Sequence, residues 1–149
     1  MNPAVAPLAQ ICAINASAAF NRWCGIEVDH AEPGRVEISM PWRAEAGQYS
    51  GFLHAGLVGA LIDTACGFAA ATLVGRVLAS HFSVNCLRPA VGQRFIARAR
   101  VVKPGKSQVF TSCELYALAA GEEKLVATGE TLLVVVGTEA AAGRPFPLP

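Results

Sequence analysis

The segment Leu53–Val74 constrains the fold more than any other part of the chain, because it is almost entirely apolar and about as long as a membrane span. Asp63 lies in its middle, Gly and Ala are abundant in it, and the rest of the chain alternates as soluble sheet does. These three features argue against a membrane span. A helix that is apolar on all sides is enclosed on most of them. The sequence therefore predicts a buried central helix from about His54 to Leu73, and no membrane partner.

Segments with the two-residue alternation of half-buried strands lie on both sides of this helix. Two precede it, joined by turn residues at positions 32–34, and four follow it, separated by further turns. The six expected strands are Ile26–Val28, Arg35–Met40, Val77–Leu87, Arg94–Val102, Gln108–Leu118 and Lys124–Val136. Glu114 is expected to pair across the sheet with Arg98 or Arg100. One antiparallel sheet that curls around one helix satisfies this order, which is an α+β fold.

The two ends of the chain differ from this unit. Residues 4–22 are rich in Ala and Leu and predict an N-terminal helix. Residues 138–149 are rich in Ala, Gly and Pro and predict an irregular tail. Because 149 residues suffice for one ordinary domain but not for two, we expect residues 1–149 to form a single domain.

Composition narrows the partners and the compartment. Hydrophobic residues make up 53% of the chain and charged residues only 15%, so some of the apolar excess is expected in a subunit interface. The net charge of +1, with scattered Lys and Arg, gives no electrostatic footprint for a nucleic acid. The N-terminus lacks the features of a secretory signal, and five cysteines without a C-x-x-C pair favour reduced thiols over disulfides or zinc. We therefore expect a cytoplasmic protein.

Asp63 is the first candidate for chemistry, because a carboxylate inside an apolar helix costs several kcal/mol unless it is paired, hydrated or protonated. A structural explanation would be a buried hydrogen-bond network, or a salt bridge to an arginine such as Arg88. A catalytic explanation would be a perturbed acid in a cleft. The residue alone fits both.

His54 stands where the preceding loop meets the helix, and the free N–H groups of the first turn, those of Ala55 and Gly56 among them, point outward there. Such a helix start can hold the oxygen of a polarised carbonyl. Nine residues at about 100° each place Asp63 on the opposite face of the helix, about 13 Å further along the axis. One helix cannot bring these groups together, but two antiparallel copies related by a two-fold axis can. This spacing predicts a dimer with two sites.

The spacing resembles that of the hotdog-fold thioesterases of the phenylacetic-acid-degradation (PaaI-like) type. In that family an Asn or Gln precedes a His-Gly-Gly by six residues, and an Asp or Glu follows the His by nine. Gln48, His54-Ala55-Gly56 and Asp63 stand at those intervals. Residues 87–92 and the turn 103–106 also resemble the family, and the likeness spans about residues 25 to 136.

The resemblance implies a hotdog fold, a curled antiparallel sheet wrapped around one long helix, and hydrolysis of an aryl or medium-chain acyl-CoA. It implies that Asp63 acts as nucleophile or as general base on water, that the Ala55 amide and its neighbour from Gly56 hold the thioester oxygen, and that Gln48 and His54 position the substrate or the water. A thioester has a good leaving group, so neither a metal nor a cofactor is required. Subunits would form dimers that pair into tetramers.

Basic side chains near the mouth of the site would meet the CoA phosphates. The candidates are Arg88, Lys103 and Lys106. For each of them alone, a charge at a strand end that faces water is an equally good explanation.

Three positions depart from the family pattern. Ala55 replaces the first Gly and adds a methyl group where substrate passes, although it keeps its N–H. Ala79 stands where the family often has a Ser or Thr that helps the acid, and Ser80 beside it would face the other side of a regular strand. His81 occupies a place that is usually acidic, either as a substitute catalytic group or as a surface residue.

Two other functions remain open on the same scaffold. A noncatalytic acyl-CoA binding protein is favoured by Ala55 and Ala79, because a fold does not confer activity. A hotdog dehydratase is disfavoured, since none of the three histidines has an Asp five residues before it. The sequence does not identify the acyl group.

Overall fold

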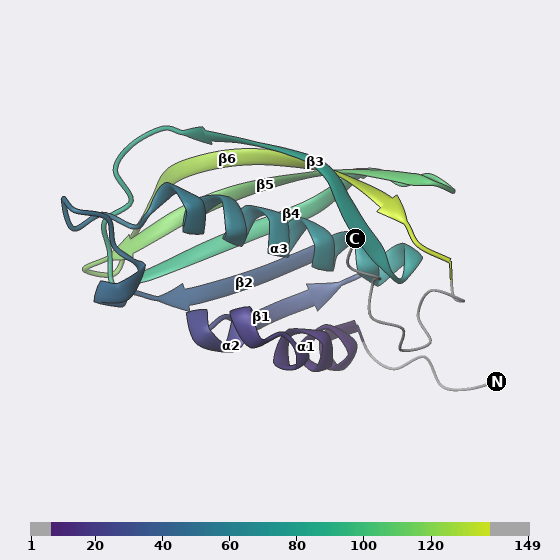
Figure 1. Ribbon diagram of the computed structural model, residues 1–149, viewed down its shortest axis with the longest axis horizontal. Helices are drawn as coiled ribbons and strands as arrows, with labels where there is room; N and C mark the ends of the chain where they lie inside the picture. The colour runs from purple at the N-terminus through teal and green to yellow at the C-terminus, as the bar shows by residue number, and fades with distance from the viewer. Residues whose placement is uncertain (1–6, 138–149) are drawn as a thin grey trace, which may run out of the picture.

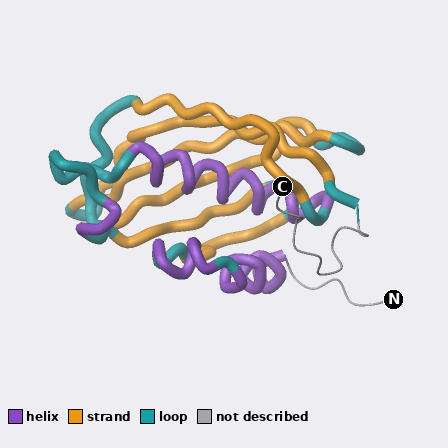
Figure 2. Tube along the Cα trace, viewed as in Figure 1, coloured by secondary structure: helices purple, strands orange, loops and turns teal. Residues whose placement is uncertain are grey.

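The computed structural model describes residues 7–137, in which a six-stranded antiparallel sheet curls around one long helix, α3 (Ala55–Val74) (Figures 1 and 2). The strands lie in the order β1-β2-β4-β5-β6-β3. Their bounds are β1 Glu27–Glu32, β2 Arg35–Pro41, β3 Val77–Cys86, β4 Arg94–Lys103, β5 Gln108–Ala119 and β6 Glu122–Val135. This is the hotdog architecture that the sequence predicts.

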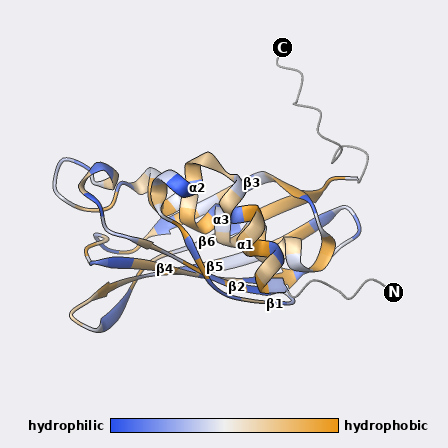
Figure 3. Ribbon diagram, turned by 90° about the horizontal axis from the view of Figure 1, so that it is seen from below, coloured by the Kyte–Doolittle hydropathy of each residue, from blue (hydrophilic) through white to orange (hydrophobic). Residues whose placement is uncertain are grey.

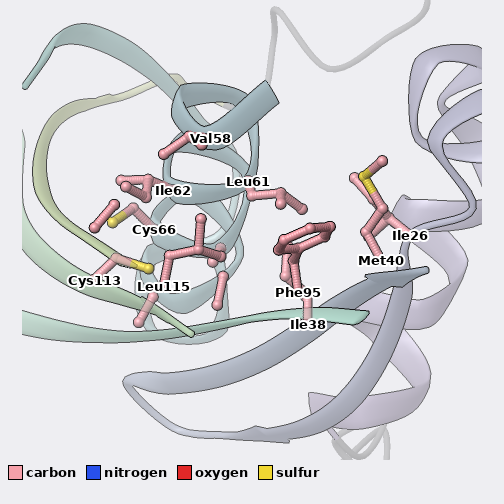
Figure 4. Close-up of a cluster of buried hydrophobic side chains, with 14 of the residues drawn as sticks. Ile26, Ile38, Met40, Val58, Leu61, Ile62, Cys66, Phe95, Cys113 and Leu115 are labelled. Atoms are coloured by element: carbon pink, nitrogen blue, oxygen red, sulfur yellow. The ribbon is translucent and has the colours of Figure 1, made fainter. Parts of the chain in front are cut away.

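The apolar character of α3 is explained by its place in the core. By length and composition alone it could cross a membrane, yet half of it is buried against the sheet within the chain. Figure 3 shows this mostly apolar helix lying over one face of the sheet. Leu61, Ile62 and Cys66 of α3 pack against inward-facing side chains such as Phe95 and Leu115, all of them fully buried (Figure 4). Alternation in the strands thus supplies the apolar face that covers the helix.

A row of small residues lets α3 approach the sheet closely. Ala99, Cys113 and Gly129 are paired side by side across β4, β5 and β6. Gly129 leaves no room for a side chain, because a Cβ there would lie 2.6 Å from the Ser83 carbonyl oxygen and 2.7 Å from Cγ2 of Ile62. The helix and the sheet are therefore in direct contact over this row.

Gly129→Ala is expected to lower the free energy of unfolding by about 1–3 kcal/mol, the usual cost of overpacking a core. Denaturant unfolding measures this change. Gly137→Ala is the matched control, because a Cβ at Gly137 would meet nothing within 4 Å. An unchanged unfolding midpoint in Gly129→Ala would contradict the close contact described here.

The outer face of the sheet is polar, and its ion pairs differ from the expectation. Glu114 lies opposite Arg98 in the register, as predicted. The Arg98 guanidinium, however, binds Glu37 and Glu123, each at 2.7 Å, and lies 4.9 Å from the centre of the Tyr116 ring. The Glu114 carboxylate instead accepts a hydrogen bond from the Tyr116 hydroxyl. The expected ion pair of Glu114 with Arg98 or Arg100 is therefore wrong. Glu37 and Glu123 occupy the Arg98 guanidinium, and no ion pair joins Glu114 to Arg100 among residues 7–137.

The N-terminal region forms two helices rather than the single helix expected over residues 4–22. They are α1 (Pro7–Ser17) and α2 (Ala19–Cys24), and residues 4–6 lie outside the described part. Ala18 between them is extended, with φ −90° and ψ 117°. The Asn15 side chain donates to the Ile26 carbonyl and accepts from Nδ2 of the Asn21 side chain, which ties the junction of α1 and α2 to the start of β1. The predicted tail, residues 138–149, also lies outside the described residues.

The first strand is longer than predicted, since β1 extends to Glu32 instead of ending at Val28. A register shift between Val28 and His30 interrupts its alternation, which is the pattern of a β-bulge. The other five strands match their expected bounds within two residues.

Candidate active site

The loop before α3 is folded tightly against its neighbours and fixes the start of the helix. Its backbone makes hydrogen bonds from the Gln48 amide to the Phe52 carbonyl at 2.8 Å and from the His54 amide to the Ala46 carbonyl at 2.9 Å. The Leu53 amide donates to the Ala90 carbonyl at 3.0 Å, which joins this loop to the segment after β3. The helix therefore begins at a defined place beside that segment.

His54 is the N-cap of α3. Its Nδ1 accepts a hydrogen bond from the Gly56 amide at 2.8 Å, and its carbonyl accepts from the amides of Leu57 and Val58. Since Nδ1 is an acceptor, the proton of a neutral His54 ring is on Nε2, which faces away from this bond and can donate. The cap thus uses three of the first-turn amides.

The Ala55 amide is the one that remains, with no acceptor among residues 7–137. The helix dipole places partial positive charge at this N–H. The expected pair of oxyanion donors is accordingly reduced to one within the described chain, because the Gly56 amide is bonded to His54.

A cleft of about 490 Å³ opens at this helix start and gathers several of the predicted residues. Gln48, His54, Ala55 and Arg88 all line it. The other lining residues are mostly apolar: Tyr49, Phe52, Leu53, Val58, Cys86, Leu87, Pro89, Ala90 and Val126. The amides of Leu87 and Arg88 donate to the Val126 carbonyl and hold this wall against β6.

Gln48 lies at the rim of the cleft in a turn that it helps to form. Its side-chain Oε1 accepts from the Ser50 amide, and its backbone carbonyl accepts from the Gly51 amide at 2.9 Å. The side-chain NH₂ group makes no hydrogen bond to residues 7–137 and is the part of Gln48 that can reach a ligand.

Asp63 is half-buried on α3 and does not line the cleft of its own protomer. Burial raises the pKa of its carboxyl above the ordinary value. Neither an ion pair nor a hydrogen bond joins this side chain to any residue between 7 and 137, so the structural explanation through Arg88 is absent there. It shares the outward stripe of α3 with the small or short residues Ala60, Thr64 and Gly67.

Lys103 and Lys106 lie at the end of the protomer opposite the cleft, beside the turn between β4 and β5 (Figure 1). The structure therefore brings Arg88 to the cleft and leaves the two lysines away from it within one chain.

The departures at positions 79 to 81 are on the strand β3. A register shift falls between Ala79 and His81, and the Ser80 hydroxyl donates to the Leu132 carbonyl at 3.2 Å. Phe82 and Val84 contact α3 near Gly59, so His81 lies on the opposite, outer face, where it is exposed. Ser80 is thus engaged with the backbone of β6.

Sequence reasoning missed Tyr49, Cys86 and Val126 as cleft residues. Tyr49 is 99% exposed and sits at the mouth. Cys86 pairs with Ala127 on the face of the sheet that covers α3, at the end of β3 nearest the helix start. Strand alternation combined with the predicted antiparallel order could have placed Cys86 there.

A second hollow, of about 570 Å³, lies on the outer face of the sheet. Charged side chains such as Arg35, Arg100 and Glu130 line it. It holds none of the predicted site residues.

Comparison with known proteins agrees with this geometry. Residues 50–124, half of the chain, match the Thioesterase superfamily. A solved thioesterase family protein from Silicibacter pomeroyi is 38% identical, with a TM-score of 0.85 over 88% of this chain and 99% of that one. The PaaI protein of the phenylacetic acid degradation operon of E. coli has the same fold, at 23% identity and a TM-score of 0.77 over 87% of this chain and 96% of that one.

A curated relative from Halobacterium salinarum, which carries a provisional esterase name, is 32% identical over 91 residues. That match spans 56% of this chain and 60% of the relative, so the chain covers less than two thirds of it. The family match and the similar structures agree: the chain belongs to the Thioesterase superfamily and has the hotdog fold.

Proposed function

We propose that this protein hydrolyses an aryl or medium-chain acyl-CoA to the free acid and CoA. The observation that carries the proposal is the Ala55 amide, which has no acceptor among residues 7–137, at a cleft that also holds Gln48, His54 and Arg88. A donor fixed at a helix start can stabilise the oxyanion that forms when a thioester carbonyl is attacked. Membership of the Thioesterase superfamily supports the reaction class.

The attacking group would be the Asp63 carboxylate, directly or through a water from which it takes a proton. Attack at the carbonyl carbon forms a tetrahedral oxyanion, and its collapse breaks the C–S bond and releases CoA as thiolate. The Gln48 NH₂ group and Nε2–H of His54 would orient the carbonyl or the water. Neither a metal nor a cofactor takes part in these steps.

Assembly of two chains would complete the site, because Asp63 is not at the cleft of its own protomer. The edge strand β3 supports this: apart from His81 it carries no charged residue, and it exposes Leu78 and Phe82. Antiparallel pairing of two β3 edges would place the two α3 helices side by side in opposite directions. The small residues around Asp63 allow a close approach of the second helix.

The same arrangement would give roles to the basic residues. Arg88 lines the cleft and can bind a CoA phosphate from the same chain. The end of the protomer that carries Lys103 and Lys106 would lie next to the cleft of the partner, since the two copies run in opposite directions. The pairing of such dimers into tetramers, and a cytoplasmic location, remain predictions of the same proposal.

The function is tested with a panel of aryl and medium-chain acyl-CoAs. Hydrolysis is measured as the loss of the thioester absorbance. We expect turnover of at least one of them by a particle at least twice the 15.5 kDa mass of one chain, measured by light scattering. Dilution to monomers should abolish turnover. Tight CoA binding without hydrolysis of any thioester would identify a noncatalytic binding protein instead, and a monomeric active enzyme would contradict the shared site.

A further inference from the structure

Two cysteines meet in the core directly below the helix turn that follows Asp63. Cys66 of α3 is 0% exposed and Cys113 of β5 is 3% exposed. Figure 4 shows both sulfur atoms in the space between the helix and the strand. Their proximity lowers the pKa of Cys66 and raises the pKa of Cys113. No role in the proposed hydrolysis requires this pair.

The row of small residues in the sheet explains why the two sulfurs can meet. Cys113 lies between Ala99 and Gly129 in the register, and Gly129 leaves no space between β6 and Ile62 of α3. The helix and the sheet are thus in contact beside the two thiols. A disulfide between them requires Cα atoms about 4.4–6.8 Å apart.

The hydroxyl groups around Cys66 favour its thiolate. The Thr111 hydroxyl donates to the Thr131 carbonyl at 2.8 Å, whereas the buried Thr131 hydroxyl has no hydrogen-bond partner among residues 7–137. A Cys66 thiolate would accept the hydrogen of Thr131. The neighbouring Cys113 thiol lowers the pKa of the Cys66 thiol despite its burial, and the nearby threonine hydroxyls add to this shift. The Cys66 thiol in turn raises the pKa of Cys113.

We propose that Cys66 and Cys113 form a reversible disulfide when the protein meets a hydroperoxide. The Cys66 thiolate attacks one peroxide oxygen, the O–O bond breaks to give the sulfenic acid, and the expelled hydroxide (or alkoxide) takes up the proton that the thiol released, which gives water (or an alcohol). Cys113 then attacks the sulfenic sulfur, its proton leaves with the hydroxyl as water, and the S–S bond forms. The two electrons lost by the thiols reduce the peroxide. A small neutral oxidant suits a pair that is closed to bulk solvent.

The disulfide would act on the site through α3. Cys66 is three residues, about one turn, after Asp63, so a covalent link from Cys66 to β5 draws this turn of the helix toward the sheet. A displacement of a reacting group by about 1 Å can cost on the order of 10²-fold in rate. Oxidation is therefore expected to lower turnover by about tenfold or more, a consequence that rests on the proposed function.

The experiment uses the full chain with the exposed thiols removed, as Cys12→Ser/Cys86→Ser, to prevent links between molecules. It is treated with hydrogen peroxide, alkylated, digested without reductant and analysed by mass spectrometry. We expect the peptides of Cys66 and Cys113 to be linked. The buried Cys24 should stay free and serves as an internal control, since it has no thiol partner. Turnover in this background, measured before and after oxidation, should fall and return on reduction.

Cys113→Ala in the same background should form no link and keep its turnover after peroxide, and Cys113→Ser replaces it if the alanine variant does not fold. Free Cys66 and Cys113 after complete oxidation of an exposed model thiol would overturn the proposal. A link that leaves turnover unchanged would overturn the regulatory effect. Because the link is read by mass, it is tested even if no acyl-CoA proves to be a substrate.

Discussion

Asp63→Asn is expected to lower kcat for acyl-CoA hydrolysis by a factor of about 10²–10⁴, the usual contribution of a positioned acid or base. The side-chain shape is kept, while the group that attacks or takes the proton from water is lost. Steady-state kinetics on the best substrate of the panel measures the effect. Asp29→Asn, which changes an exposed carboxylate on β1, is the matched control and should keep the activity of the wild type.

The pH dependence of the same reaction gives a second measure. Burial raises the pKa of Asp63 above that of an exposed Asp, which is about 3.9. As the pH falls, the Asp63 carboxylate is therefore protonated at a higher pH than an exposed one. Turnover should therefore fall as the pH drops through this raised pKa. The free energy of unfolding depends on pH in the opposite direction to turnover. A carboxyl whose pKa is higher in the folded state destabilises the protein above that pKa, and this destabilisation disappears at low pH.

Asp63→Asn carries no such charge and should unfold at the same temperature as the wild type or a higher one at neutral pH. A folded Asp63→Asn with full turnover would refute the role of this carboxylate. A marked fall in its unfolding temperature would instead reveal a structural partner for Asp63 in the assembled protein.

Ala55→Pro is expected to lower kcat by about 10²–10³ with the fold intact, because it removes the amide at the helix start that has no acceptor in the described part of the chain. Proline is tolerated at the first position of a helix, where its N–H would take no part in the helix. His54 before it has φ −59° and ψ 135°, which suits a residue that precedes proline. Kinetics of the purified variant, with circular dichroism to check the fold, measures the loss.

Ala55→Gly is the matched control for this variant. It keeps the N–H, removes only the methyl group, and should hydrolyse the substrate about as well as the wild type. Turnover by Ala55→Pro at the wild-type rate would show that the thioester oxygen is held elsewhere.

The parts of the fold that depend on hydrophobic pattern could be predicted from the sequence. The apolar run around Asp63 marked α3 within one residue at each end, and alternation marked β2 to β6. The pattern failed at β1, where the bulge after Val28 breaks the alternation. Most side chains of this edge strand are exposed, so they need not be apolar. It also failed at Ala18, because neither Pro nor Gly marks the break between α1 and α2.

The candidate site was predictable where spacing along one helix or loop decides it. The sequence places Gln48, His54 and Ala55 at one cleft because they flank a single helix start. The occupation of the Gly56 amide depends on the side-chain conformation of His54, which no spacing reveals. The distance of Lys103 and Lys106 from the cleft depends on which end of β4 they follow, and therefore on the direction of each strand in the sheet.

The two edges of the sheet differ in how readily each could add a strand from another copy. The β1 edge carries Glu27, Asp29 and Glu32 and has α1 packed beside it, whereas β3 at the far edge is almost free of charge. Charged and covered edges resist strand addition. If two copies pair through the β3 edge, they can do so only once, head to head, and the sheet would then end in a closed pair instead of extending into a fibre.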